Sequence, residues 1–75
     1  MEEQNYTCRE ILSNMQEFCH SIINSEPAPC GSVASIEYYR YHPEKFSSLE
    51  KEALDEGLAV VTATLLGKSG LLSVN

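Results

Sequence analysis

The sequence is poor in basic residues: five lysines and arginines stand against eleven acidic residues in 75, for a formal net charge of −6. The five are scattered along the chain, whereas binding to duplex nucleic acid requires a basic face that displaces counterions from phosphates. Binding to anionic membrane surfaces is disfavoured for the same reason. We therefore expect no duplex nucleic acid and no membrane among the partners, and an acidic surface that suits a protein partner with a basic surface.

The sequence also has no long apolar run and few cysteines. Its longest apolar stretch, residues 58–66 (LAVVTATLL), is about half the roughly 20 residues that a membrane-spanning helix needs. The first residues are acidic and polar, unlike the basic and apolar parts of a secretory signal. Three cysteines, an odd number, fit a reducing compartment better than a disulfide framework. We expect a cytoplasmic protein in which residues 1–5 are disordered.

The length predicts one small domain over residues 1–75. With 43% hydrophobic and 21% charged residues, the composition is that of a globular protein. A chain of this size buries only about 60 to 65% of the surface that its unfolded state exposes, so its stability is marginal without a supplement. Disulfides, a metal or oligomerisation are the usual supplements.

Two segments have the pattern of amphipathic helices. Apolar residues between Cys8 and Ile23 recur at intervals of three and four, and Thr7 followed by Glu10 is typical of a capping box. This predicts a helix over about 7–24, which the prolines and glycine of residues 25–32 would end. A second capping pattern starts a helix predicted over about 47–66, with Gly67 as its stop.

Two parts of the chain remain ambiguous at this level. Residues 33–41 (VASIEYYRY) are interpreted as a short helix closed by His42-Pro43, although valine, isoleucine and tyrosine also favour a strand. Gly57 could end the second long helix and leave residues 58–66 as a strand of a hairpin. The prediction is thus a mainly α bundle of two or three helices; the alternative is an α+β fold with strands at 33–41, 58–66 and 71–74.

Several short motifs have chemical interpretations that do not hold. Gly67-Lys68-Ser69 resembles the end of a phosphate-binding loop, but Thr62 stands where that loop requires its first glycine. Ser48 and Lys51 have SxxK spacing without its companion motifs, and helix capping explains the serine better. We predict no catalytic residue and no enzyme.

The cysteines give no metal-binding pattern. Cys8 and Cys19 are eleven residues apart and share the apolar helix face, which predicts core positions. Together with His20, Cys30 and His42 they match no zinc-binding spacing, so no metal and no cofactor is predicted. Cys30, in a loop, remains open as a regulatory thiol.

The strongest concentration of binding chemistry runs from Tyr38 to His42. Its members are Tyr38, Tyr39, Arg40, Tyr41 and His42. Tyrosine and arginine dominate protein-binding hot spots, and the same side chains could also stack on a nucleobase. The plain alternative is that the tyrosines pack beneath the long helix. Four acidic residues that follow could meet a basic partner: Glu50, Glu52, Asp55 and Glu56.

We predict a small acidic homo-oligomer that acts by binding, as an adaptor or inhibitor of a larger protein. Small acidic chains of this kind are frequent among phage and mobile-element inhibitors of host machinery. The oligomer interface is predicted in and beside the apolar stretch, at Leu54, Leu58, Val61 and Leu65, because so short a chain has little else with which to cover it. The alternative function is an oligomer that binds a small nucleotide-like ligand.

Overall fold

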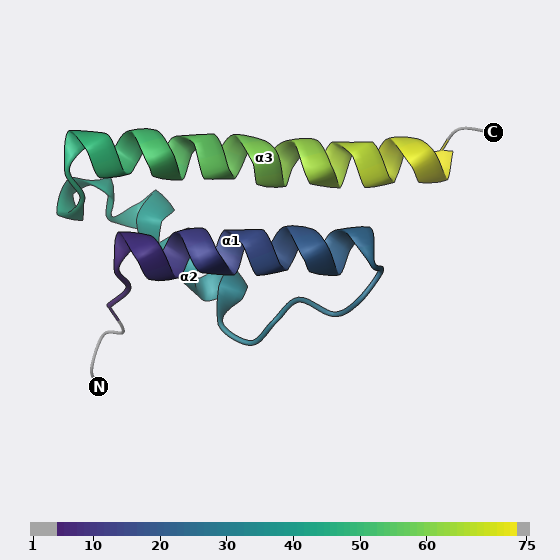
Figure 1. The fold of residues 1–75 in the computed structure, drawn as a ribbon, viewed down its shortest axis with the longest axis horizontal. Helices are drawn as coiled ribbons and strands as arrows, with labels where there is room; N and C mark the ends of the chain where they lie inside the picture. The colour runs from purple at the N-terminus through teal and green to yellow at the C-terminus, as the bar shows by residue number, and fades with distance from the viewer. Residues whose placement is uncertain (1–4, 74–75) are drawn as a thin grey trace.

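A computed structural model of the chain describes residues 5–73, with side chains described for residues 5–67 (Figure 1). In this range the chain forms three α-helices: α1 (Cys8–Ile23), α2 (Ser32–Tyr41) and α3 (Ser48–Ser73). A short 3-10 helix, η1 (Pro43–Lys45), joins α2 to α3. The prediction of a small, mainly α bundle is confirmed.

The alternative with strands is wrong for the described residues. Residues 33–41 lie in α2, and residues 58–66 and 71–73 lie in α3. Residue 74 of the third expected strand lies outside the described residues, as do residues 1–4 of the segment expected to be disordered. The valines and threonines of α3 are accommodated because packing on α1 outweighs their weak preference for strands.

The predicted capping boxes are both present. The Glu10 amide donates to Thr7 Oγ1 (3.1 Å), and the Thr7 amide donates to Glu10 Oε1 (2.8 Å). At the start of α3 the Glu50 amide donates to Ser47 Oγ (3.2 Å), and the Ser47 amide donates to Glu50 Oε1 (2.9 Å). Each box satisfies two amides that a helix start would otherwise leave unpaired.

The end of α3 differs from the prediction. Gly67 does not stop the helix, which continues to Ser73. An interior glycine costs a helix only about 1 kcal/mol relative to alanine, and the leucines on its N-terminal side are good helix formers. α2, by contrast, ends where predicted, because Pro43 disfavours a helical backbone at His42.

The two long helices are parallel, and the shorter α2 runs obliquely to them. The loop after α1 and then α2 return the chain to the end at which α1 begins, so α1 and α3 run side by side in the same direction, and α3 extends beyond the C-terminal end of α1 (Figure 1). α1 packs against both other helices. The core takes residues from every helix and from the connection before α3: Ile11, Met15, Cys19, Ile36, Tyr39, Phe46, Leu54 and Val61.

α1 packs closely against α3 at Gly57. A methyl group on its Cα would clash with Met15 Sδ and lie 3.5 Å from Leu12 Cδ2. Met15 is itself buried, so it has little room to move aside. The glycine that made this region ambiguous in sequence is therefore explained by helix packing.

Candidate functional site

The five residues from Tyr38 to His42 do not form one surface. Successive residues of an α-helix point about 100° apart, so this run is spread around the whole of α2. Tyr39 points into the core and is 4% exposed, whereas Tyr41 points outward and is 74% exposed. Tyr38 and Arg40, two residues apart, lie on nearly opposite sides.

Tyr39 links α2 to α3. Its hydroxyl donates to Asp55 Oδ1 (2.6 Å) and lies 3.4 Å from the carbonyl oxygen of Lys51. Burial, with the neighbouring Asp55 carboxylate, raises the pKa of Tyr39 to about 12. The side chain is therefore a neutral donor at physiological pH, and its role is to hold the two helices together.

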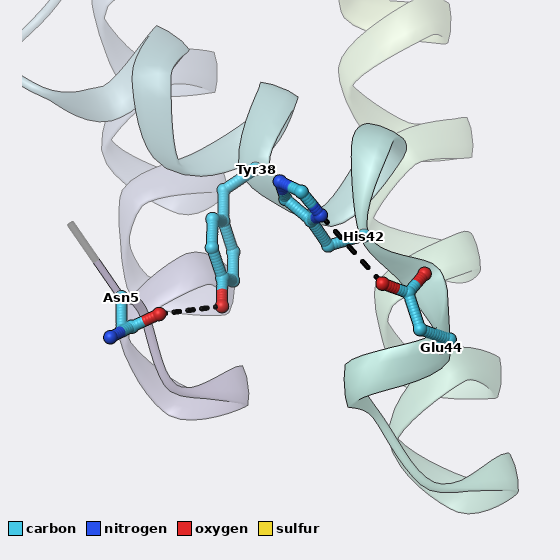
Figure 2. A network of polar contacts seen from close by, with 4 residues as sticks. All are labelled: Asn5, Tyr38, His42 and Glu44. Carbon is cyan, nitrogen blue, oxygen red and sulfur yellow. Dashed lines mark hydrogen bonds and ion pairs between the residues drawn. The ribbon is translucent and has the colours of Figure 1, made fainter. Parts of the chain in front are cut away.

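Tyr38 and His42 belong to an aromatic cluster on one side of α2. The Tyr38 ring lies 5.6 Å from that of Tyr6, 5.1 Å from that of His42 and 6.1 Å from that of Phe46. Figure 2 shows the Tyr38 hydroxyl donating to Asn5 Oδ1 (3.0 Å) and His42 Nδ1 facing Glu44 Oε2 (3.7 Å). This side of α2 thus contacts both the segment before α1 and the connection to α3.

Arg40 lies on the other side of α2, at the edge of a groove. We call this groove the α2–α3 trough; its volume is about 440 Å³. Phe18 of α1, Ile36 of α2 and Val61 of α3 contribute to its lining. Tyr38 and His42 are absent from that lining, so the guanidinium and the aromatic cluster do not converge on one ligand.

The four acidic residues of α3 that were predicted to meet a partner have different roles in the structure. Glu50 caps the helix and Asp55 accepts the Tyr39 hydroxyl. Glu52 and Glu56 are exposed and stand one turn apart on the outer side of α3. For the described side chains, no lysine or arginine nitrogen lies within 4.0 Å of these four carboxylates. The charges of Glu52 and Glu56 are therefore left for solvent or a partner.

The residues predicted to form an oligomer interface are mostly used within the monomer. Leu54 is fully buried, Val61 is 6% exposed and Leu58 is half-buried, so α1 and α2 already cover this inner side of α3. Leu65, at the rim of the trough, remains exposed. Burial of the apolar stretch therefore needs no second copy on its inner side.

Apart from Leu65, the exposed apolar residues within 58–66 are ones that the sequence prediction omitted. Val60 is 58% exposed and Leu66 is 67% exposed, and Ala59 and Ala63 are exposed between them. We call these four residues the outer stripe. A helical projection of the sequence places Ala59, Ala63 and Leu66 on the side away from Leu54 and Val61. Val60 lies at the margin of that side, where it borders α1. The periodicity of the sequence therefore indicates these exposed positions.

The three cysteines differ in their surroundings. Cys19 is buried, as predicted, and Thr64 Oγ1 lies 3.6 Å from its sulfur. Burial, with the nearby Glu50 carboxylate, raises the pKa of the half-buried Cys8 thiol and so disfavours the thiolate. Cys30 is exposed and free. Among the described residues, no three His, Cys, Asp or Glu side chains gather closely enough to hold a metal ion.

No known protein family, curated protein or solved structure matches this chain. No helix in the described part of the chain is long and apolar enough to cross a membrane.

Proposed function

We propose that this chain is a small acidic homo-oligomeric binding protein, an adaptor or inhibitor of a larger protein with a basic surface. The observation that carries the proposal is the division of the outer side of α3. Toward the start of α3 it bears the exposed carboxylates of Glu52 and Glu56, and over residues 59–66 it is the uncharged outer stripe. Neither half is needed to fill the monomer's own core.

The outer stripe suits association between copies. Leu66 and Val60 leave apolar area in water next to two small alanines, which allow a second backbone to approach closely. Each apolar Å² removed from water contributes about 25 cal/mol. Association would thereby supplement the marginal stability expected of so small a core.

The acidic half suits a basic protein surface. A net charge of −6 raises the rate of encounter with a cationic partner, and exposed carboxylates set the orientation of the complex. The alternative of a nucleotide-like ligand has less support, because Tyr38 and Arg40 lie on different sides of α2.

Light scattering at micromolar concentration tests the oligomer. We expect the wild-type chain to exceed the monomer mass of 8.3 kDa and Leu66→Asp to fall to it, because a charge would enter the contact. Leu49→Asp is the matched control, since Leu49 lies on the same helix, 78% exposed, before the acidic half. A monomeric wild type would overturn homo-oligomerisation.

Affinity capture from the native host, followed by identification of co-eluting proteins, tests the partner. Glu52→Lys should reduce capture of a basic protein, because Glu52 has an exposed carboxylate without a capping role. Glu17→Lys, on the exposed side of α1, changes the net charge equally and should leave capture close to wild type. Equal losses for both variants would reduce the interaction to nonspecific charge and contradict a defined acidic face.

A further inference from the structure

The α2–α3 trough is bordered by two helices over equal lengths. Val33 and Arg40 mark its extent on α2, and Leu58 and Leu65 mark it on α3. Each pair spans seven residues, which is about 10 Å or two helical turns. α2 runs obliquely back toward the start of α3 (Figure 1), and Phe18 of α1 also lines the trough between them. A segment of helix two turns long is the natural occupant of such a groove.

The two charged residues that line the trough, Glu37 and Arg40, both lie on α2. Arg40 stands at the end nearest the Tyr39–Asp55 hydrogen bond, and Glu37 stands one turn earlier on the same wall. Toward Val33 and Leu65 the lining residues are apolar or threonine. An occupant that fits this pattern has an apolar face about two turns long, preceded by a carboxylate that reaches Arg40.

The outer side of α3 has this arrangement in the same chain. The outer stripe occupies two turns, from Ala59 to Leu66, and is uncharged. Glu56 precedes Val60 by one turn on the same side of the helix, and its carboxylate is exposed. Ala59 and Ala63 keep this face narrow enough to lie between two other helices.

We propose that the outer stripe of one copy docks in the α2–α3 trough of another copy, with Glu56 of the first pairing with Arg40 of the second. This inference rests on the proposed homo-oligomerisation and specifies its geometry. The docked helix runs parallel to the α3 helix that forms the trough wall, because Glu56 lies at the Arg40 end. Glu37 then faces the uncharged stripe, and Glu52 remains in solvent for the basic partner.

The outer stripe and the α2–α3 trough are different surfaces, so the contact between copies is head-to-tail. Such an interface leaves a free trough at one end of a dimer and a free stripe at the other, and it propagates into a ring or an open chain of copies. This property separates the proposal from a symmetric contact in which two outer stripes pair with each other.

A mixing experiment tests the head-to-tail contact. Val33→Asp blocks the trough, Leu66→Asp blocks the stripe, and both residues are exposed, so circular dichroism should show each variant folded. By light scattering, each variant alone should be a monomer. An equimolar mixture should recover a dimer, because the intact stripe of Val33→Asp docks in the intact trough of Leu66→Asp.

The other outcomes overturn the proposal in different ways. A Val33→Asp variant that assembles like wild type, or a mixture that remains monomeric while wild type assembles, excludes the trough but leaves homo-oligomerisation intact. A monomeric wild type excludes both. Ala63→Asp provides a second stripe variant, since Ala63 lies farther around α3 from the trough than Leu66 does.

A charge exchange tests the Glu56 to Arg40 pair. Arg40→Glu and Glu56→Arg each place like charges together, and each should weaken self-association by about two- to fivefold at low salt. An equimolar mixture of the two variants restores opposite charges in every contact between unlike copies and should return to the wild-type affinity. Unchanged association in both single variants would overturn the assigned pair and the orientation of the docked helix.

Discussion

The inner and outer sides of α3 within residues 58–66 differ in burial. On the inner side of residues 58–66 Val61 is buried against the rest of the bundle, as is Leu54 in the preceding turns, while on the outer side Val60 and Leu66 remain in solvent. Both sides of the stretch are uncharged, so the absence of charge does not show which of them is covered. Helical periodicity does, because it turns consecutive residues toward different surroundings.

The difference also separates stability from interaction. A buried apolar residue contributes to folding whether or not the protein meets a partner, whereas an exposed one contributes only when another surface covers it. The inner side should therefore determine the free energy of unfolding, and the outer side should determine association. Three predictions test this division within the monomer.

The largest difference is expected between leucines on the two sides. Leu54→Ala should lower the free energy of unfolding by about 2–5 kcal/mol, because it leaves a cavity at a fully buried site. Leu66→Ala should change it by about 0.5 kcal/mol or less. Urea unfolding, at a concentration where light scattering reports a monomer, measures both. Equal losses would contradict the assignment of Leu66 to the free surface.

Two of the three glycines of α3, Gly57 and Gly67, should respond to alanine with opposite signs. Gly57→Ala should destabilise the monomer, since the clash with Met15 costs about 1–3 kcal/mol against a gain in helix propensity of about 1 kcal/mol. Gly67→Ala meets nothing within 4 Å and should stabilise by about 0.5–1 kcal/mol. Thermal unfolding of both variants checks the contrast. Stabilisation by Gly57→Ala would show that α1 and α3 are less tightly packed there.

The smallest effect concerns the hydrogen bond between α2 and α3. Tyr39→Phe should cost about 1 kcal/mol at neutral pH through loss of the bond to Asp55. Since the folded pKa of Tyr39 is about 12 and that of an unfolded tyrosine is about 10, the folded chain keeps the proton over this range. The stabilisation is fully present below pH 10 and is lost as the pH rises toward 12.

The variant provides the control for that pH dependence. Lysines and the other tyrosines titrate in both proteins, so the informative quantity is the difference between wild type and Tyr39→Phe in urea unfolding from pH 9 to pH 12. This difference should shrink as the pH rises. A constant difference would mean that Tyr39 ionises equally in the folded and unfolded chains.

The helix starts were predictable because their signals are local. Thr7 with Glu10, and Ser47 with Glu50, satisfy backbone amides three residues apart and need nothing from the rest of the chain. The end of α3 was not predictable in the same way. Glycine often ends a helix, but Gly67 does not. Glycine can adopt both helical and non-helical backbone conformations, so the neighbouring residues decide whether the helix continues.

The candidate site was likewise only partly predictable from the sequence. Closeness in sequence suggested a cluster from Tyr38 to His42, but a helix separates such neighbours around its axis. The aromatic cluster instead gathers Tyr6, Tyr38, His42 and Phe46 from three parts of the chain. No sequence pattern indicates that Arg40 borders a trough built with residues of α1 and α3.

The sequence by itself determined where α1 and α3 begin, where α2 ends, the net negative charge and the position of the apolar stretch, and it left open whether residues 33–41 and 58–66 are helix or strand. These follow from capping, proline sterics, composition and periodicity, all of which act within a few residues. Only the tertiary structure decided which side of that stretch is covered. It did so because Gly57 lets α1 approach α3 closely and the Tyr39–Asp55 bond joins α2 to α3, leaving the outer stripe uncovered.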